Sequence, residues 1–229
     1  MIGLLLSLAV LLGDPYDQQA SVVVVVGAEG TEEYGRQFRQ WAGRWRDAAD
    51  RGHASFAVIG LDEPGEATDR ELLKRRLDEE AKGRHEALWL VFIGHGTFDG
   101  KTAKFNLRGP DLSGSELAVW LASCERPLAI LNCASASGPF VNELSGPNRV
   151  VVTASKSGFE HNFARFGDYL SGAIADPKAD LDKDDETSLL EAFLMAAGHW
   201  RIDAFRAFPG MRRRDPYRRD GHGWRRLTT

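Results

Sequence analysis

Short apolar runs alternate along this chain with longer amphipathic stretches, and this alternation predicts an α/β protein. The apolar runs are rich in valine, isoleucine, leucine and aromatic residues, which is typical of strands covered on both faces. The predicted strands are residues 21–26, 54–61, 87–94, 127–131 and 149–153. Helical spacing between and after them predicts helices that begin near Thr31, Ala67, Asp111 or Ser113, and Phe163. We therefore expect one domain over residues 21–198, with a mostly parallel sheet flanked by helices on both faces in three layers.

Local signals set two boundaries within this pattern. Thr31 is followed by two glutamates, a combination that favours the start of a helix. The aromatic stripe that follows at helical spacing, at residues 34, 38, 41 and 45, predicts a helix packed on the sheet. Asp99-Gly100 is a tight-turn signal and predicts a small hairpin after the third strand.

A candidate site comes from residues 87–96, where a buried strand ends at a histidine between two glycines, Gly94-His95-Gly96. Catalytic groups in parallel sheets gather at the carboxyl ends of the strands. A lone histidine there more often caps the next element. Here, however, the next parallel strand ends in Cys133-Ala134-Ser135, so two strands deliver an imidazole, a thiol and a hydroxyl to one edge.

These groups match the requirements of acyl transfer. His95 would act as the base, Cys133 or Ser135 as the nucleophile, and the backbone N–H of Gly96 as a donor to the oxyanion. This chemistry requires no cofactor. Side chains alternate along a strand, so Cys133 and Ser135 point the same way if the strand continues through both. The sequence leaves open which of the two is the nucleophile.

Four motifs carry a family resemblance. They are Gly94-His95-Gly96-Thr97-Phe98-Asp99-Gly100, Phe105-Asn106-Leu107-Arg108-Gly109-Pro110-Asp111-Leu112, Ser135-Ala136-Ser137-Gly138 and Thr153-Ala154-Ser155-Lys156-Ser157-Gly158. With them, residues 22–193 resemble the caspase and legumain clan of cysteine peptidases, and most closely bacterial relatives of the legumain and GPI-transamidase branch. The resemblance implies a caspase-like fold and a peptide or protein substrate.

The residue at the position of the clan's catalytic cysteine differs in this chain, and this difference leads to two functional hypotheses. The clan's catalytic cysteine stands in Cys-x-Ser-Gly, and anchoring on Ser137-Gly138 places Ser135 at that position. Cys133 then falls where many members carry an acidic residue of the specificity pocket. The first hypothesis is a peptidase-like hydrolase that uses His95 with Cys133 or Ser135. The second is a catalytically inactive binding domain on the same fold, which calcium stabilises.

An acidic segment at residues 180–191 matches the spacing of a twelve-residue calcium loop. The candidate ligands at positions one, three, five, seven, nine and twelve are Asp180, Asp182, Asp184, Glu186 through its carbonyl, Ser188 and Glu191. The departure is Asp185, where such loops carry glycine, although aspartate tolerates left-handed geometry better than most residues. The alternative is an acidic helix start, because carboxylates before Leu189 favour the helix dipole. A bound calcium ion would be structural.

Composition adds expectations for the two ends of the chain. Residues 1–20 include an apolar segment too short to span a bilayer, and its length fits the core of a secretory signal. We expect export, or a cytoplasmic location if this segment is not a signal. Residues 199–229 carry nine arginines against three aspartates within a chain of net charge −4. This basic tail makes nucleic-acid binding a third and weakest hypothesis.

Overall fold

A computed structural model of the chain describes residues 20–82, 86–160, 165–207, 219–220 and 223–224. The elements of the main body are, in chain order, β1 (Ser21–Val26), α1 (Glu32–Arg51), β2 (Ser55–Ile59), α2 (Asp69–Glu80), β3 (Leu88–Ile93), β4 (Gly96–Phe98), β5 (Ala103–Phe105), β6 (Leu112–Ser113), α3 (Gly114–Trp120), β7 (Leu128–Asn132), α4 (Phe140–Leu144), β8 (Arg149–Thr153), α5 (Phe166–Ile174), the 3₁₀ turn η2 (Pro177–Ala179) and α6 (Leu189–Ala207). Two short strands follow, β9 (Arg219–Asp220) and β10 (Gly223–Trp224). The predicted signal segment, the first two residues of the helix predicted from Phe163 and most of the basic tail lie outside the described residues.

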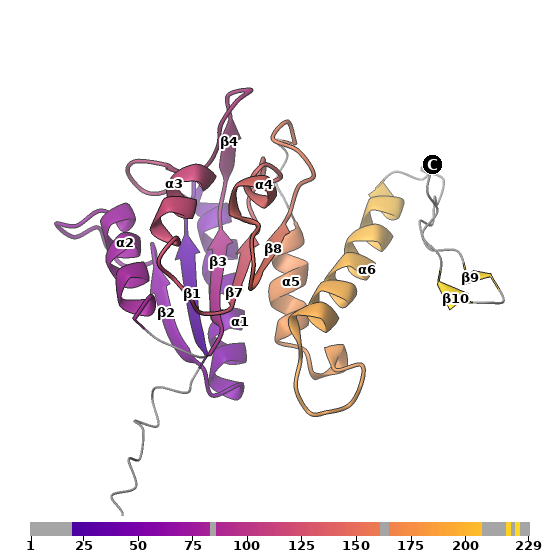
Figure 1. Cartoon of the computed structure of the whole chain (residues 1–229). Coiled ribbons are helices and arrows are strands. Elements are labelled where there is room, and N and C mark those ends of the chain that lie inside the picture. The colour runs from indigo at the N-terminus through magenta and orange to yellow at the C-terminus, as the bar shows by residue number, and fades with distance from the viewer. Residues whose placement is uncertain (1–19, 83–85, 161–164, 208–218, 221–222, 225–229) are drawn as a thin grey trace, which may run out of the picture.

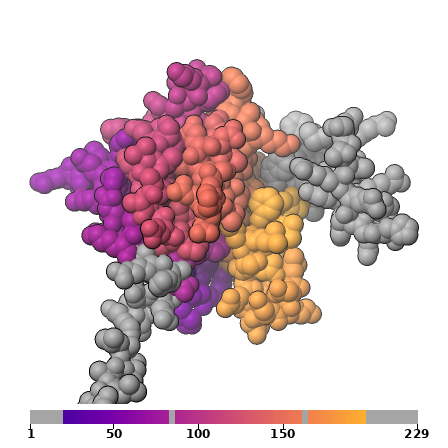
Figure 2. Space-filling view, viewed as in Figure 1, coloured from indigo at the N-terminus to yellow at the C-terminus, as the bar shows by residue number. Residues whose placement is uncertain are grey.

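Five parallel strands form the central sheet in the order β2-β1-β3-β7-β8 (Figure 1). One face is covered by α1, α5 and α6, and the other by α2, α3 and α4. In the space-filling view the gold-coloured segment forms a lobe beside the rest of the body (Figure 2). The prediction of a three-layer α/β fold with a mostly parallel sheet is confirmed.

The alternation of side chains along the central strands explains why the sheet holds two separate cores. In β1, the side chains of Val22, Val24 and Val26 pack under α1, whereas Val23 and Val25 face α2 and α3. The same parity holds in β3 and β7. Because successive side chains of a strand point to opposite faces, a strand with helices on both sides must be apolar at every position.

A second, three-stranded antiparallel sheet, β4-β5-β6, lies over the carboxyl ends of β1 and β3. It includes the predicted hairpin at Asp99-Gly100, and Gly100 has a φ of 93°. The backbones approach closely here: a Cβ added to Gly27 would lie 2.3 Å from the carbonyl oxygen of Asn106. The N–H of Ala28 donates to that same oxygen at 2.9 Å. These contacts fix the loop after β1 against the segment that follows β5.

Several boundaries agree with the sequence and others differ. Thr31 caps α1, and of the two predicted caps for α3 it is Ser113 that accepts from the backbone. The strand predicted over residues 54–61 is shorter, and the helix predicted from Ala67 begins after a Thr68 cap. The short helix α4 was not predicted. Within the described part of the chain, no helix has both the length and the apolar character that crossing a bilayer requires.

Candidate functional site

His95 lies at the carboxyl edge of the sheet, directly between β3 and β4. Its half-buried ring packs edge-on against two aromatic rings of α1, at 4.8 Å from Tyr34 and 5.3 Å from Phe38 between ring centroids. Its Nε2 lies 3.3 Å from the carbonyl oxygen of Glu29, so the tautomer protonated at Nε2 donates a hydrogen bond there. The predicted aromatic stripe of α1 therefore holds the imidazole as well as packing on the sheet.

Ser135 is joined to the glycine that follows this histidine. The N–H of Gly96 donates to the Ser135 Oγ at 3.3 Å, and this Oγ donates to the carbonyl oxygen of Gly96 at 3.2 Å. Ser135 is 5% exposed. The structure thus brings together Ser135 and the predicted oxyanion donor, and the bond between them already uses that donor.

Cys133 continues the parity of β7 into the core. It follows Ala129 and Leu131 on the face covered by α1 and α5, and it is 2% exposed. Its Cβ lies 3.0 Å from the position that a Cβ on Gly167 would take. Burial in these apolar surroundings raises the pKa of the Cys133 thiol to about 12. A thiol in this position is protonated at neutral pH.

The two residues do not share one extended strand. β7 ends at Asn132, and Ala136 takes a φ of 55°, a left-handed conformation that reverses the chain after Ser135. Hydrogen bonds hold this turn to the segment after β8. The N–H of Ala136 donates to the Glu160 carbonyl oxygen at 2.9 Å, and the N–H of Gly138 donates to the Ser155 Oγ at 3.0 Å. Together with Gly96, three backbone donors at this edge are bonded within the fold.

A cavity of about 390 Å³ opens beside the His95 edge, between the loops that follow β1 and β2. It is lined by Val26, Gly27, Ala28, Glu29, Gly30, Gly35, Phe38, Arg39, Gly60, Leu61, Asp62, Glu63 and Arg108. Phe38 also contacts the ring of His95, and a Cβ on Gly30 would lie 3.7 Å from the His95 Nε2. The cavity and the histidine therefore share a wall.

Arg108 closes one side of this cavity. Its Nε and Nη2 donate to the two carboxylate oxygens of Asp69 at 2.7 and 2.8 Å, and its Nη1 donates to the Asp62 carbonyl at 2.6 Å. Asp69 is 4% exposed. The hydrogen bonds that Arg108 donates to the Asp69 carboxylate raise the pKa of Arg108, so the guanidinium stays charged and its charge is balanced by Asp69. A bidentate pair of this kind holds the loop after β5 on the first turn of α2.

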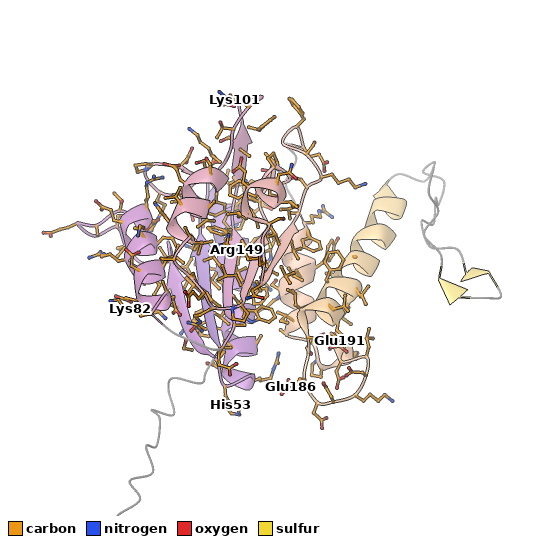
Figure 3. All side chains as sticks on the ribbon, viewed as in Figure 1. His53, Lys82, Lys101, Arg149, Glu186 and Glu191 are labelled. Atoms are coloured by element: carbon orange, nitrogen blue, oxygen red, sulfur yellow. The ribbon has the colours of Figure 1, made fainter. Side chains whose placement is uncertain are left out.

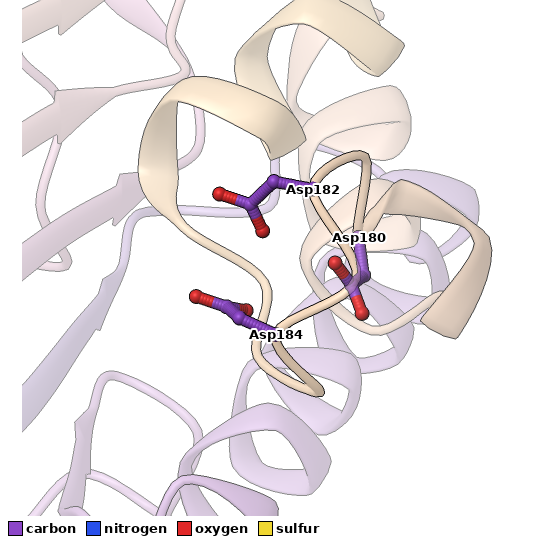
Figure 4. A group of neighbouring side chains, drawn as sticks. All are labelled: Asp180, Asp182 and Asp184. Carbon is purple, nitrogen blue, oxygen red and sulfur yellow. The ribbon is translucent and has the colours of Figure 1, made fainter.

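The acidic segment between η2 and α6 adopts part of the conformation expected for a calcium loop. Ligand oxygens of Asp180, Asp182 and Asp184 lie within 4.8 Å of one another (Figure 4). The Asp180 carboxylate accepts from the N–H of Asp185 at 3.1 Å. Asp185 itself has a φ of 70°, so aspartate does take the left-handed geometry that glycine supplies in such loops.

Glu191, the predicted twelfth position, has different partners. Its carboxylate accepts from the backbone N–H groups of Leu181, Asp182 and Ser188, and from the Ser188 hydroxyl. These hydrogen bonds lower the pKa of Glu191 to about 2. The like charge of Asp184 raises the pKa of Asp182. The three aspartates therefore fit a hard cation, whereas Glu191 would have to release backbone donors to bind it. The predicted ligands Glu186 and Ser188 are exposed.

The acidic loop and the histidine edge lie at opposite ends of the sheet. In Figure 3, Glu186 and Glu191 lie toward the same end of the body as His53, whereas Lys101 of the hairpin marks the other end. A cation in the loop would therefore be remote from His95.

The sequence did not predict the cavity, because its lining comes from loops far apart in the chain. The available signal was the set of glycines directly after β1 and β2, which mark close backbone approach. Comparison with models of protein families finds no match, and comparison with curated proteins finds none either.

Proposed function

We propose that this chain is a caspase/legumain-like domain that binds a partner molecule without cleaving peptide bonds. The carrying observation is the burial of Cys133, whose thiol has a pKa of about 12. A thiol with so high a pKa is protonated at pH 7, whereas the thiolate is the nucleophilic form. The sulfur also lies among core side chains, where a peptide carbonyl has no access.

The surroundings of Ser135 support the same proposal. Its hydroxyl donates to the carbonyl oxygen of Gly96 at 3.2 Å. A serine nucleophile needs a base that takes the hydroxyl proton and free donors that receive the oxyanion. The N–H groups of Gly96 and Ala136 are both bonded within the protein. What remains at this edge is a shaped surface with a cavity beside it, which suits binding.

Alkylation of the native protein tests this proposal, with Cys124 as an internal control because it is half-buried rather than buried. We expect iodoacetamide to modify Cys124 faster than Cys133 in the folded protein, and both after unfolding, as read by mass spectrometry of peptides. We also expect no cleavage of casein or of a mixed peptide library. Hydrolysis that His95→Ala abolishes, or His95-dependent labelling of Cys133 by a peptide electrophile, would overturn the proposal in favour of a peptidase.

A second candidate function is structural calcium binding by the loop at residues 180–191. The observation that favours it is the convergence of the three aspartate carboxylates in a loop with left-handed residues at positions four and six, Lys183 and Asp185. Clustered carboxylates repel one another, so a divalent cation bound by their oxygens would stabilise the folded chain.

Thermal unfolding with calcium, with magnesium and with a chelator tests this candidate. We expect calcium to raise Tm, and Asp182→Asn with Asp184→Asn to remove the rise. Glu125→Gln, which neutralises an exposed carboxylate elsewhere, is the control. An equal Tm with calcium and with chelator, or a rise that survives the double substitution, would exclude the loop as a calcium site.

A further inference from the structure

We propose that the cavity between the loops after β1 and β2 binds the guanidinium of an arginine side chain or of a small organic guanidine. This inference names the ligand chemistry for the binding domain proposed above and rests on that function. The cavity volume of about 390 Å³ falls within the range of small-ligand sites. The site lies at the carboxyl ends of parallel strands, where α/β proteins bind their ligands.

The charges of the lining favour a cation. Three carboxylates and two guanidinium groups line the cavity. The charge of Arg108 is matched by buried Asp69, with all three of its donor nitrogens bonded. The charge of Arg39 is balanced by Glu29, whose Oε2 lies 3.6 Å from the Arg39 Nη2. Asp62 and Glu63 are left as excess negative charge at one side of the opening, and both are exposed.

The apolar part of the lining can pack against the flat guanidinium group and the methylene chain of an arginine-like ligand. The lining includes the apolar end of β1, the side chains of Phe38 and Leu61, and the glycine-rich turn after β1. Glu29 lies directly against Gly35 of α1, since a Cβ on Gly35 would meet the Glu29 carboxylate at 1.8 Å. The missing side chain at Gly35 therefore leaves room for the Glu29 carboxylate. A guanidinium can bond two carboxylates in its plane, which an ammonium does less well.

The wall shared with His95 gives the site a specific reporter. The ring of His95 contacts Phe38 and lies beside Gly30, and both of these residues line the cavity. A ligand that fills the cavity therefore changes the surroundings of this imidazole without touching Cys133 or Ser135. Nuclear magnetic resonance of the histidine ring protons reports such a change.

The test is a titration of the full chain with acetyl-arginine methylamide, with agmatine, and with acetyl-citrulline methylamide, which has the same shape as the arginine probe without its charge. We expect saturable binding of the two guanidines, a shift of the His95 ring signals, and at least tenfold weaker binding of the citrulline compound. A tighter complex with the arginine derivative identifies a peptide ligand, and a tighter complex with agmatine a free guanidine. The double variant Asp62→Asn/Glu63→Gln should weaken binding at least tenfold, whereas Glu66→Gln, on the same turn and outside the lining, should leave it unchanged.

Three results overturn the inference: no saturable binding of either guanidine, equal binding of the citrulline compound, or affinity unaffected by the double variant. Circular dichroism of each variant shows whether it is folded, and the substituted side chains are exposed, so we expect all of them to fold. Any of these results leaves the proposal of a non-catalytic domain standing, since that proposal depends on the alkylation and cleavage experiments. Conversely, peptide cleavage would overturn the non-catalytic function without deciding what the cavity binds.

Discussion

The hydroxyl of Ser135 bonds both polar groups of the Gly96 backbone, accepting from the N–H at 3.3 Å and donating to the carbonyl at 3.2 Å. This pairing connects the turn after β7 to the first residue of β4. The hydroxyl stands where the resemblance to the peptidase clan places a nucleophile, and here it acts as a structural link. Its removal is therefore expected to affect stability.

Ser135→Ala should lower the free energy of unfolding by about 1–2 kcal/mol, because it leaves the Gly96 N–H and carbonyl without these partners. Urea unfolding monitored by tryptophan fluorescence measures the change. Ser123→Ala, at an exposed position, serves as the control and should change stability by less than about 0.5 kcal/mol. Equal stabilities for Ser135→Ala and wild type would show that the link contributes nothing.

Gly96→Ala should be more damaging than the loss of the hydroxyl. An added Cβ would lie 2.3 Å from the Ser135 carbonyl oxygen and 3.1 Å from that of Lys104, and both are backbone atoms. Overpacking against backbone costs roughly 3 kcal/mol. Gly43→Ala in α1 meets no atom within 4 Å and should instead stabilise by about 0.5–1 kcal/mol. Thermal unfolding of the two variants should thus give Tm changes of opposite sign.

Alkaline pH should destabilise the protein through Cys133. Its pKa is raised from 9.0 to about 12 in the folded protein, so between these values the unfolded chain loses the proton and the folded chain keeps it. Stability then falls as pH rises, by about 1.4 kcal/mol per pH unit for this group. Comparing wild type with Cys133→Ala at pH 8 and pH 10 isolates the effect, because other titrating groups are common to both. A stability difference that does not change with pH would contradict the buried thiol.

Acid should weaken the protein through Glu116. Hydrogen bonds from Arg70 and Ser113 lower the pKa of Glu116 to about 2, so its contribution is complete above the ordinary value of 4.5. The contribution is lost as pH falls from 4.5 through about 2. We expect Glu116→Gln to be less stable than wild type at pH 6, and the gap to narrow at pH 3. The midpoints of urea unfolding at both pH values measure this difference in stability. Glu125→Gln, at an exposed position, is the control.

The sequence predicted the sheet because its strands are apolar at every position, a pattern that requires cover on both faces. The position of Cys133 follows from the same parity, since it lies two residues after Leu131 on the α1 face. The left-handed conformation of Asp185 agrees with the tolerance of aspartate for this geometry, which keeps the calcium loop open as a hypothesis. In each case the physical cause is local to one segment of the chain.

Other features depend on segments that meet only after folding. The partner of Ser135 is set by the turn at Ala136, and nothing in a run of small residues indicates that an alanine takes a positive φ. The partners of Glu191 are backbone groups that come close only once the loop has closed. The residues of the cavity come from three loops, one helix and the end of β1, and their shared volume is visible only in three dimensions.

The strand order β2-β1-β3-β7-β8 also bears on how the chain acquires its structure during synthesis. This order allows β1 and β2 to pair before β3 is made, β3 to join the free side of β1, and β7 and β8 to extend that same side in the order in which the ribosome releases them. No strand of the sheet has to insert between two that are already paired. A nascent chain that ends after Ile93 already holds three strands able to pair, so assembly can keep pace with translation from that point on.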